Sequence, residues 1–355
     1  MRWAFAWSNR APSRKVTMRS DEHWMKEAME AAVASRRQVS PRPWVGAVLV
    51  ARDGAAYRGA TQGQSGPHAE VCALREAGEQ ARGGTLYVTL EPCSHHGKTP
   101  PCADAVIAAG VARCVVGVGD PDERVAGRGL ERLRAAGIEV TTGVLEAHVS
   151  EQLAPYLHHR RTGRPLVVLK LAATLDGRTA AADGTSQWIT GPQARLDAHR
   201  LRADSDAILV GAGTVRADDP ALTVRLPEGE LVGAQPLRVV LGRAPAGAKV
   251  HPCLERSGSL EAVLDELGQR GVLQLLVEGG ATVAQAFHAG GLVDRYVVYL
   301  APAFFGGEQA RAMFVGPGGA TMTDLARGRL LRVDRLGEDL RVDVAPLRGG
   351  QEASR

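Results

Sequence analysis

Short apolar runs alternate with amphipathic stretches through the first half of the chain. Apolar runs over 45–51, 55–61, 85–90, 112–118 and 138–144 predict strands, and Asp53-Gly54 between the first two predicts a hairpin turn. Helical spacing over 21–34, 68–81, 101–109 and 129–136 predicts four helices, the first N-capped by Ser20 and the others ended by glycines. Strands that alternate with helices of this length indicate an α/β fold with parallel strand pairs.

A second series of the same kind begins after a polar stretch. Apolar runs over 166–171, 207–210, 237–241, 273–277 and 295–300 predict strands, stretches near 192–203, 259–269 and 281–289 predict helices, and 331–344 predicts a final hairpin around Gly337. We therefore predict two domains, 18–145 and 166–346, joined by a polar linker over 146–165. Residues 1–17 and 347–355 are expected to be a disordered extension and a disordered tail.

Composition and charge narrow the function classes. The 355 residues are 45% hydrophobic and 23% charged, which is ordinary for a globular protein, and no apolar run is long enough to span a bilayer. The net charge of +4 comes from 43 Lys+Arg and 39 Asp+Glu spread along the chain, which argues against nucleic acid as a partner. Five cysteines favour a reducing, cytoplasmic setting with a cysteine-bound metal over a disulfide scaffold.

The most informative pattern combines His68-Ala69-Glu70 with Pro92-Cys93 and then Cys102. One imidazole and two thiolates suit Zn²⁺, and three protein ligands leave a fourth position for water. An open zinc site lowers the pKa of its water towards about 7. Glu70, two residues after His68 at a helix start, would face that position and move a proton from water to a leaving amine. The pattern predicts a zinc-dependent hydrolytic deaminase.

Two non-catalytic interpretations compete with this one. The first is a buried histidine beside two inert cysteines, which the spacing of the three segments disfavours. The second is a binding module with a structural zinc, although structural sites normally have four protein ligands. Cys72, Cys114 and Cys253 are expected to be core residues, and only Cys72 is near enough in sequence to be confused with a ligand.

The run from Thr89 to Cys102, which reads TLEPCSHHGKTPPC, resembles the signature of the bifunctional deaminase–reductases of riboflavin biosynthesis. The resemblance extends over about 21–344 and includes Asp120-Pro121 and the Val-Ala-Gly-Arg-Gly run at 125–129. It implies a cytidine-deaminase-like domain followed by a dihydrofolate-reductase-like domain. The first would remove the 2-amino group of 2,5-diamino-6-ribosylamino-4(3H)-pyrimidinone 5′-phosphate, a small pyrimidine ribosyl phosphate. By resemblance, zinc is held by His68, Cys93 and Cys102, Glu70 is the proton shuttle, and Lys98 either meets the substrate phosphate or is a solvated loop lysine.

Further motifs of the family occur at 170–178, 186–191, 202–225 and 277–281. They imply that the second domain uses NADPH to reduce the ribosylamino sugar to a ribitylamino chain. The strand, two glycines and helix over 277–281 suit a cofactor pyrophosphate. The implied substrate contacts are Ser186, Arg202, Leu222, Arg225 and Glu278, with the two arginines clamping the 5′-phosphate. The implied NADPH contacts are Ala172, Trp188, Thr214, Asp218, Gly280, Ala281, Thr282, Val283, Ala284, Gln285 and Ala286. Non-functional alternatives are a core position for Trp188 and a helix-surface position for Arg202.

The chain also departs from the family pattern. Members often carry Asn-Pro-x-Val-Gly where this chain has Arg42-Pro43-Trp44-Val45-Gly46, and Thr61 or a neighbour replaces a histidine. The short segment between His251 and the helix near Ser259 predicts that an edge strand is missing. These departures keep open a specialised paralogue that acts on a related pyrimidine. The resemblance also implies a homodimer or tetramer.

Overall fold

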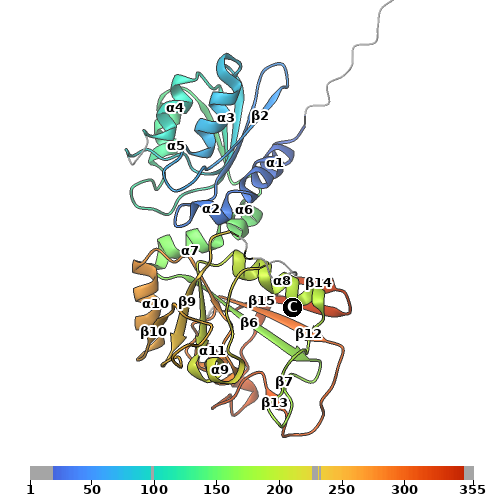
Figure 1. The fold of residues 1–355 in the computed structure, drawn as a ribbon. Helices are drawn as coiled ribbons and strands as arrows, with labels where there is room; N and C mark the ends of the chain where they lie inside the picture. The colour runs from blue at the N-terminus through green and yellow to red at the C-terminus, as the bar shows by residue number, and fades with distance from the viewer. Residues whose placement is uncertain (1–18, 97–99, 226–230, 232, 348–355) are drawn as a thin grey trace, which may run out of the picture.

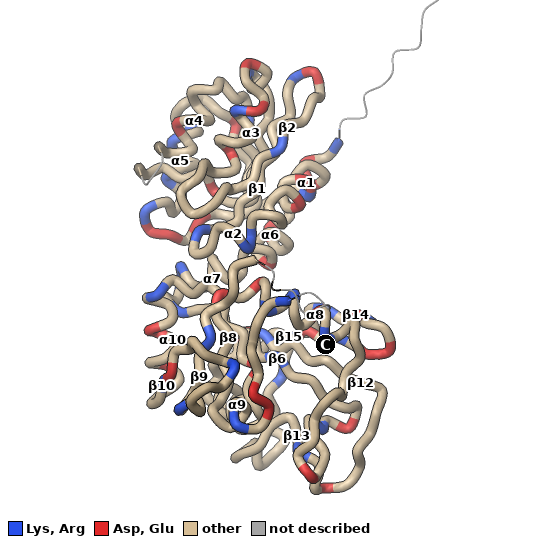
Figure 2. Tube along the Cα trace, viewed as in Figure 1, with Lys and Arg blue, Asp and Glu red and all other residues tan. Residues whose placement is uncertain are grey.

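The computed structural model describes residues 19–96, 100–225, 231 and 233–347. The predicted extension at 1–17, Lys98, and the tail from 348 onward lie outside the described residues. Figure 1 shows two sheets, each flanked by helices, with α6 and α7 at the junction between the two bodies. Among the described residues, no helix is both long enough and apolar enough to cross a membrane. Figure 2 shows basic and acidic residues interspersed over both bodies, as the sequence predicts.

The first domain contains a five-stranded sheet with the order β2-β1-β3-β4-β5. The hairpin β1–β2 and the pair β1–β3 are antiparallel, whereas β3–β4 and β4–β5 are parallel. All five predicted strands are present; β3 has the predicted bounds, and the other four are shortened by one or two residues at their ends. Their bounds are Gly46–Val50 (β1), Ala56–Ala60 (β2), Thr85–Leu90 (β3), Arg113–Val118 (β4) and Glu139–Thr142 (β5).

Helices on both faces of this sheet close the first core. Ser20 caps the first helix as predicted, because its side chain accepts a hydrogen bond from the His23 N–H. Gly46 in β1 allows a close approach of that helix, since a Cβ at this position would lie 1.8 Å from the Ala28 carbonyl oxygen. The helices are Asp21–Val33 (α1), Arg36–Val39 (α2), Ala69–Ala77 (α3), the 3₁₀ turn Gly78–Ala81 (η1), Cys102–Ala108 (α4) and Arg128–Ala135 (α5).

The segment 146–165, which its polar composition led us to interpret as a linker, is helical. It forms α6 (Glu146–Gln152) and α7 (Ala154–Thr162). Four of its residues are buried in the core of the first domain, namely Val149, Leu153, Tyr156 and Leu157. The polar residues that suggested a linker occupy the other faces of two short amphipathic helices. The segment is therefore packed against the first domain.

The second domain contains an eight-stranded sheet with the order β10-β9-β8-β11-β6-β12-β15-β14. The pairs from β10 to β12 are parallel, and β15 and β14 add an antiparallel hairpin around Gly337, as predicted. The strands are Leu166–Thr174 (β6), Ala207–Gly211 (β8), Leu237–Leu241 (β9), Leu254–Arg256 (β10), Gln274–Val277 (β11), Arg295–Ala301 (β12), Gly328–Leu336 (β14) and Asp339–Pro346 (β15). A separate small sheet pairs Arg178–Ala180 (β7) with Arg311–Ala312 (β13).

The three predicted helices of this domain are present, but the helix at 212–218 was not predicted, and the expected loss of an edge strand is wrong. β10 supplies that strand with three residues, which pair in parallel with β9. A strand this short gives no detectable alternation of apolar and polar residues, so the pattern did not predict it. The helices are Pro192–Ala203 (α8), Ala212–Asp218 (α9), Leu260–Gln269 (α10), Ala281–Ala289 (α11) and the 3₁₀ turn Met322–Asp324 (η2).

Candidate active sites

Three side chains with metal-binding chemistry meet between α3 and α4. His68 is the N-cap residue of α3, Cys93 follows β3, and Cys102 is the first residue of α4. His68 Nδ1 lies 3.6 Å from Cys93 Sγ and 3.1 Å from Cys102 Sγ. Zn–N bonds of about 2.05 Å and Zn–S bonds of about 2.3 Å at a tetrahedral angle place the ligand atoms about 3.6 Å apart. The predicted ligands are therefore together, and their spacing fits Zn²⁺.

Glu70 lies in the first turn of α3, two residues after His68, and its side chain is buried. Burial raises the pKa of its carboxyl, and the nearby Cys93 adds to the rise, although His68 opposes it. A general acid–base group must take up a proton and return it, and a raised pKa favours uptake of the proton by this carboxylate. The position and environment of Glu70 therefore suit the predicted proton shuttle.

The two thiols of this cluster differ in proton affinity when no metal is bound. A hydrogen bond with Cys102, followed by one with His68, lowers the pKa of Cys93. The same contact with Cys93, together with burial, raises the pKa of Cys102. A bound zinc ion deprotonates a coordinating thiol outright. Zinc uptake at this site is therefore expected to release a proton from Cys102.

Arg42, which stands where the family often has asparagine, lies near the predicted zinc ligands. Its Nη1 donates to the carbonyl oxygens of Gly63 and Gly66 at 3.0 and 3.1 Å, in the loop that leads to His68. Burial lowers the pKa of Arg42, and the nearby charges of Cys102, Cys93 and Glu70 oppose this effect. The substitution therefore places a positive charge near the site and connects it to the preceding loop.

Trp44 and Thr61, the other two departures from the family pattern, are both buried in the fold. Trp44 is buried, and the guanidinium of Arg36 lies 4.8 Å from its ring centroid. Thr61 is also buried, and its Oγ1 accepts a hydrogen bond from the Val45 N–H at 3.2 Å. Both side chains therefore pack or pair within the fold around β1.

Sequence analysis missed the role of Glu91, which follows β3 and is buried. Its Oε1 accepts hydrogen bonds from the N–H groups of Gly129 (3.0 Å) and Leu130 (3.4 Å). Its Oε2 accepts from Gly127 (3.1 Å) and Asp120 (3.4 Å). One carboxylate thus holds the segment 120–130 beside Cys93, one of the predicted zinc ligands. The sequence contained a signal for this role, because Glu91 directly precedes Pro92-Cys93 and the two glycines belong to the family motif at 125–129.

In the second domain, the predicted cofactor residues that begin α9 and α11 lie at the carboxyl edge of parallel strands. β8 ends at Gly211 and leads into α9, whereas β11 ends at Val277 and leads through two glycines into α11. The Gly280 N–H donates to Thr214 Oγ1 at 3.1 Å, which connects these two turns. Ligands of open parallel sheets bind at this edge, near helix N-termini. The position therefore suits a phosphate-bearing cofactor.

Glu278, at the end of β11, is held by two cations. Arg202 Nε and Nη2 donate to its carboxylate at 2.6 and 2.9 Å, and Lys170 Nζ lies 3.8 Å from Oε2. Burial acts to raise the pKa of Glu278, but Arg202 and Lys170 outweigh it, so that the pKa lies at about 2. Arg202 is therefore mostly buried and directed at Glu278, unlike the surface arginine that we considered as an alternative.

The remaining predicted reductase residues occupy varied positions. Trp188 is 68% exposed, with the Arg195 guanidinium 4.8 Å from its ring centroid, so its possible assignment to the core is wrong. Leu222 is buried with a φ of 51°, a strained backbone conformation of the kind found near ligand sites. Arg225 and Asp218 are exposed, whereas Ser186 and Ala172 are partly buried.

Along α11, exposure alternates between the two faces of the helix. Ala281, Ala284 and Gln285 are buried, whereas Thr282 and Ala286 are exposed and Val283 is intermediate. Ala284 is fully buried, so its side chain packs in the core instead of lining an accessible surface. The face with Thr282 and Ala286 is the one that is open to a cofactor.

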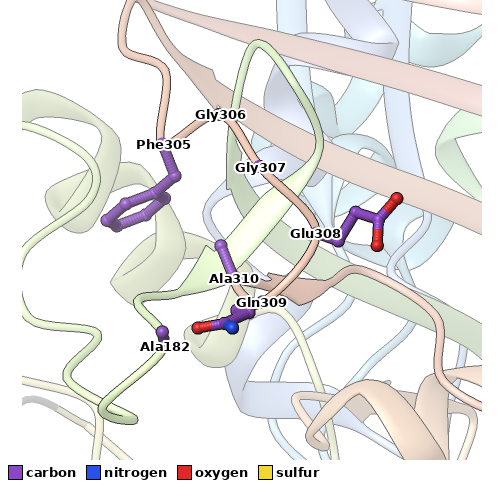
Figure 3. Close-up of a pocket in the computed structure, with 7 residues that line it drawn as sticks. All are labelled: Ala182, Phe305, Gly306, Gly307, Glu308, Gln309 and Ala310. Atoms are coloured by element: carbon purple, nitrogen blue, oxygen red, sulfur yellow. The ribbon is translucent and has the colours of Figure 1, made fainter.

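A loop near this edge was not predicted as part of any site. Asp176 accepts a hydrogen bond from the Gly306 N–H at 2.8 Å, and Arg178 donates to the Ala310 carbonyl oxygen at 2.9 Å. This loop, residues 305–310, lines an open pocket of about 550 Å³ together with Ala182. Figure 3 shows how these residues lie around it. The motif residues Asp176 and Arg178 therefore fix the loop.

Comparison with known proteins assigns both halves of the chain. Residues 18–118 match the cytidine and deoxycytidylate deaminase zinc-binding region, and residues 165–342 match the RibD C-terminal domain. The riboflavin biosynthesis protein RibD of Escherichia coli is 41% identical, over 90% of this chain and 98% of the relative. The protein of the same name from Mycobacterium tuberculosis is 46% identical, over 88% of this chain and 95% of the relative.

Solved structures agree with these matches. Acinetobacter baumannii RibD superposes with a TM-score of 0.86 at 40% identity, covering 92% of this chain and 99% of that one. A diaminohydroxyphosphoribosylaminopyrimidine deaminase/5-amino-6-(5-phosphoribosylamino)uracil reductase from Thermotoga maritima gives a TM-score of 0.81 at 34% identity, with the same coverage. These likenesses extend across both domains, and the chain belongs to the RibD family, the bifunctional deaminase–reductases of riboflavin biosynthesis.

Proposed function

We propose that the first domain hydrolyses the 2-amino group of 2,5-diamino-6-ribosylamino-4(3H)-pyrimidinone 5′-phosphate and that the second reduces the product's ribosyl group with NADPH. The meeting of His68, Cys93 and Cys102 beside Glu70 is the observation that carries the proposal. The near full-length relatives support the same pair of reactions, and the specialised paralogue gains no support from them.

In the deaminase site, we assign His68, Cys93 and Cys102 as the zinc ligands. Bound there, Zn²⁺ supplies Lewis acidity that makes water a stronger nucleophile at neutral pH. Glu70 takes up the proton that the water loses and delivers it to the leaving amine, for which its raised pKa suits it. The segment 120–130, which Glu91 anchors, forms the wall beside Cys93. Arg42 supplies positive charge near the site.

In the reductase site, we assign Glu278 and its partner Arg202 to substrate binding. Glu278 is ionised and held in one orientation, so that it can accept hydrogen bonds from the substrate. Bound NADPH supplies the hydride. The exposed Gly280 backbone and Thr214 would hold its phosphates, as the open first turn of α11 allows. Arg225 would bind the substrate phosphate, and the exposed Trp188 would pack on the cofactor.

Three further assignments complete the proposal. The domain boundary lies after α7, near Gly163, because α6 and α7 pack in the first core. The protein is a homodimer through β14, an edge strand on which Leu330 and Val333 are 59% and 52% exposed. A cytoplasmic location is supported by the cysteines, which are unpaired throughout the described residues.

The test uses purified, zinc-loaded protein with the diaminopyrimidinone substrate and NADPH, and follows ammonia release and NADPH oxidation in parallel. Two variants serve as controls for each other. Glu70→Gln should retain zinc and lose ammonia release, yet still oxidise NADPH when the deaminated intermediate is supplied. Glu278→Gln should release ammonia normally and reduce slowly. If Glu70→Gln still releases ammonia, the deaminase assignment is wrong. If Glu278→Gln still reduces the intermediate at the wild-type rate, the reductase assignment is wrong.

A further inference from the structure

A second group of metal-binding side chains lies in the reductase domain, outside both sites described above. His251 ends the loop that follows β9, Cys253 directly precedes β10, and Glu255 lies within β10. Cys253 and Glu255 are two residues apart on extended chain, so their side chains point to the same face. Figure 1 places β10 at the edge of the second domain, away from α3 and α4.

The geometry of this group matches that of a zinc site. The ligand atoms of all three residues lie within 4.8 Å of one another. His251 Nδ1 lies 3.5 Å from Cys253 Sγ, close to the separation of about 3.6 Å that tetrahedral zinc requires of a nitrogen and a sulfur ligand. In the deaminase site the corresponding separations are 3.6 and 3.1 Å. The second group is therefore as well spaced for a metal as the first.

Backbone contacts orient two of the three ligands. His251 Nε2 lies 3.1 Å from the Pro245 carbonyl oxygen, which can only accept a hydrogen bond. Nε2 therefore carries the proton in the neutral imidazole, and Nδ1 presents its lone pair towards Cys253. The Ala244 N–H donates to Glu255 Oε1 at 2.8 Å and fixes that carboxylate. Outer contacts of this kind typically orient metal ligands in proteins.

We propose that His251, Cys253 and Glu255 bind a second Zn²⁺, which joins the short strand β10 to the loop 244–251. An imidazole, a thiolate and a carboxylate are each established ligands of zinc, and water would complete the tetrahedron. The ion would brace a three-residue edge strand that has a neighbour on one side only. Cys253, which the sequence led us to expect in the core, packs against the core of this domain but is only half-buried, so its thiol is accessible to a metal.

The first experiment counts zinc in untagged protein after dialysis against Zn²⁺. The wild-type chain should hold two zinc ions. Cys253→Ser should hold one and keep releasing ammonia, whereas Cys93→Ser should hold one and lose ammonia release. Cys72→Ser is the matched control, because it removes another half-buried thiol and should leave two ions bound. One ion in the wild type, or two in Cys253→Ser, would overturn the proposal.

A second measurement needs no substitution and so does not depend on whether a variant folds. Wild-type protein with its deaminase site already filled is treated with a thiol reagent, and modification of Cys253 is followed by mass spectrometry. Added Zn²⁺ should slow this modification about tenfold when nine-tenths of the second site is occupied. An unchanged rate over the range that saturates the zinc count would show that Cys253 is not a ligand. Because this second measurement follows modification of Cys253 directly, its readout does not require the proposed deaminase or reductase activity.

Discussion

Replacing Glu91 by glutamine tests whether one buried carboxylate positions the wall of the deaminase site. The two side chains have the same shape, but the amide has one acceptor oxygen where the carboxylate has two. In the structure each oxygen of Glu91 accepts one shorter and one longer hydrogen bond, at 3.0 and 3.4 Å for Oε1 and at 3.1 and 3.4 Å for Oε2. Whichever way the amide turns, two backbone N–H groups then face an NH₂ group.

The size of the effect follows from those distances. A hydrogen bond to a charged group contributes about 1.5–3 kcal/mol, and a bond of 3.4 Å is at the weak end. Losing one shorter and one longer bond should therefore lower the free energy of unfolding by about 2–4 kcal/mol. Gly129 packs on the Pro92 carbonyl, so movement of this segment also shifts the neighbouring Cys93. A misplacement of about 1 Å near reacting groups can slow a reaction about 100-fold.

The assay combines urea unfolding with the two activities. Glu91→Gln should unfold at lower urea and release ammonia at least tenfold more slowly, while NADPH oxidation of the supplied intermediate stays unchanged. Glu79→Gln, on an exposed residue of the same domain, should shift the free energy of unfolding by no more than about 0.5 kcal/mol. Wild-type stability and ammonia release in Glu91→Gln would refute the positioning role.

Four other expectations follow from the same structure. Chelating zinc should abolish ammonia release and leave NADPH oxidation of the supplied intermediate intact, as parallel assays on one sample will show. Arg202→Met breaks a buried ion pair and should lower the free energy of unfolding by about 3 kcal/mol. Because the pKa of Glu278 is lowered from 4.5 to about 2, its ionised form stabilises the fold above pH 4.5, and this stabilisation is lost as the pH falls towards 2. Urea unfolding at a series of pH values should therefore show a smaller loss of stability at low pH in Glu278→Gln than in the wild type. Gly129→Ala places a Cβ 2.0 Å from the Pro92 oxygen and should destabilise by about 1–3 kcal/mol more than Gly318→Ala, whose Cβ meets nothing within 4 Å and whose φ is not left-handed, in the same unfolding assay.

Local chemistry made most of the fold predictable from the sequence. Ser20 caps α1, Gly337 turns the final hairpin with a φ of 69°, and α8 and α11 have the predicted bounds. Each of these features depends on residues within one or two turns of chain. The predictions for the segment 146–165 and for the strand β10 were wrong because the structure of both depends on residues far away in the sequence. The character of each is set by what it packs or pairs with, namely the first core and β9.

The same distinction applies to the candidate sites. The meeting of His68, Cys93 and Cys102 was predictable because zinc chemistry restricts residue type and spacing, and the structure does bring these three side chains together. Glu91 and Arg202 carry no such restriction. The role of Glu91 depends on backbone N–H groups that lie 29 to 39 positions away in the sequence, and the role of Arg202 depends on a carboxylate 76 positions away. The group of His251, Cys253 and Glu255 is an intermediate case. Its residue types are those that bind metals, but its sequence spacing matches none of the motifs named above. A set of metal ligands without a sequence motif is recognised only when the structure brings the ligand atoms to the separations that a bound metal requires. The zinc count decides whether this group binds a metal.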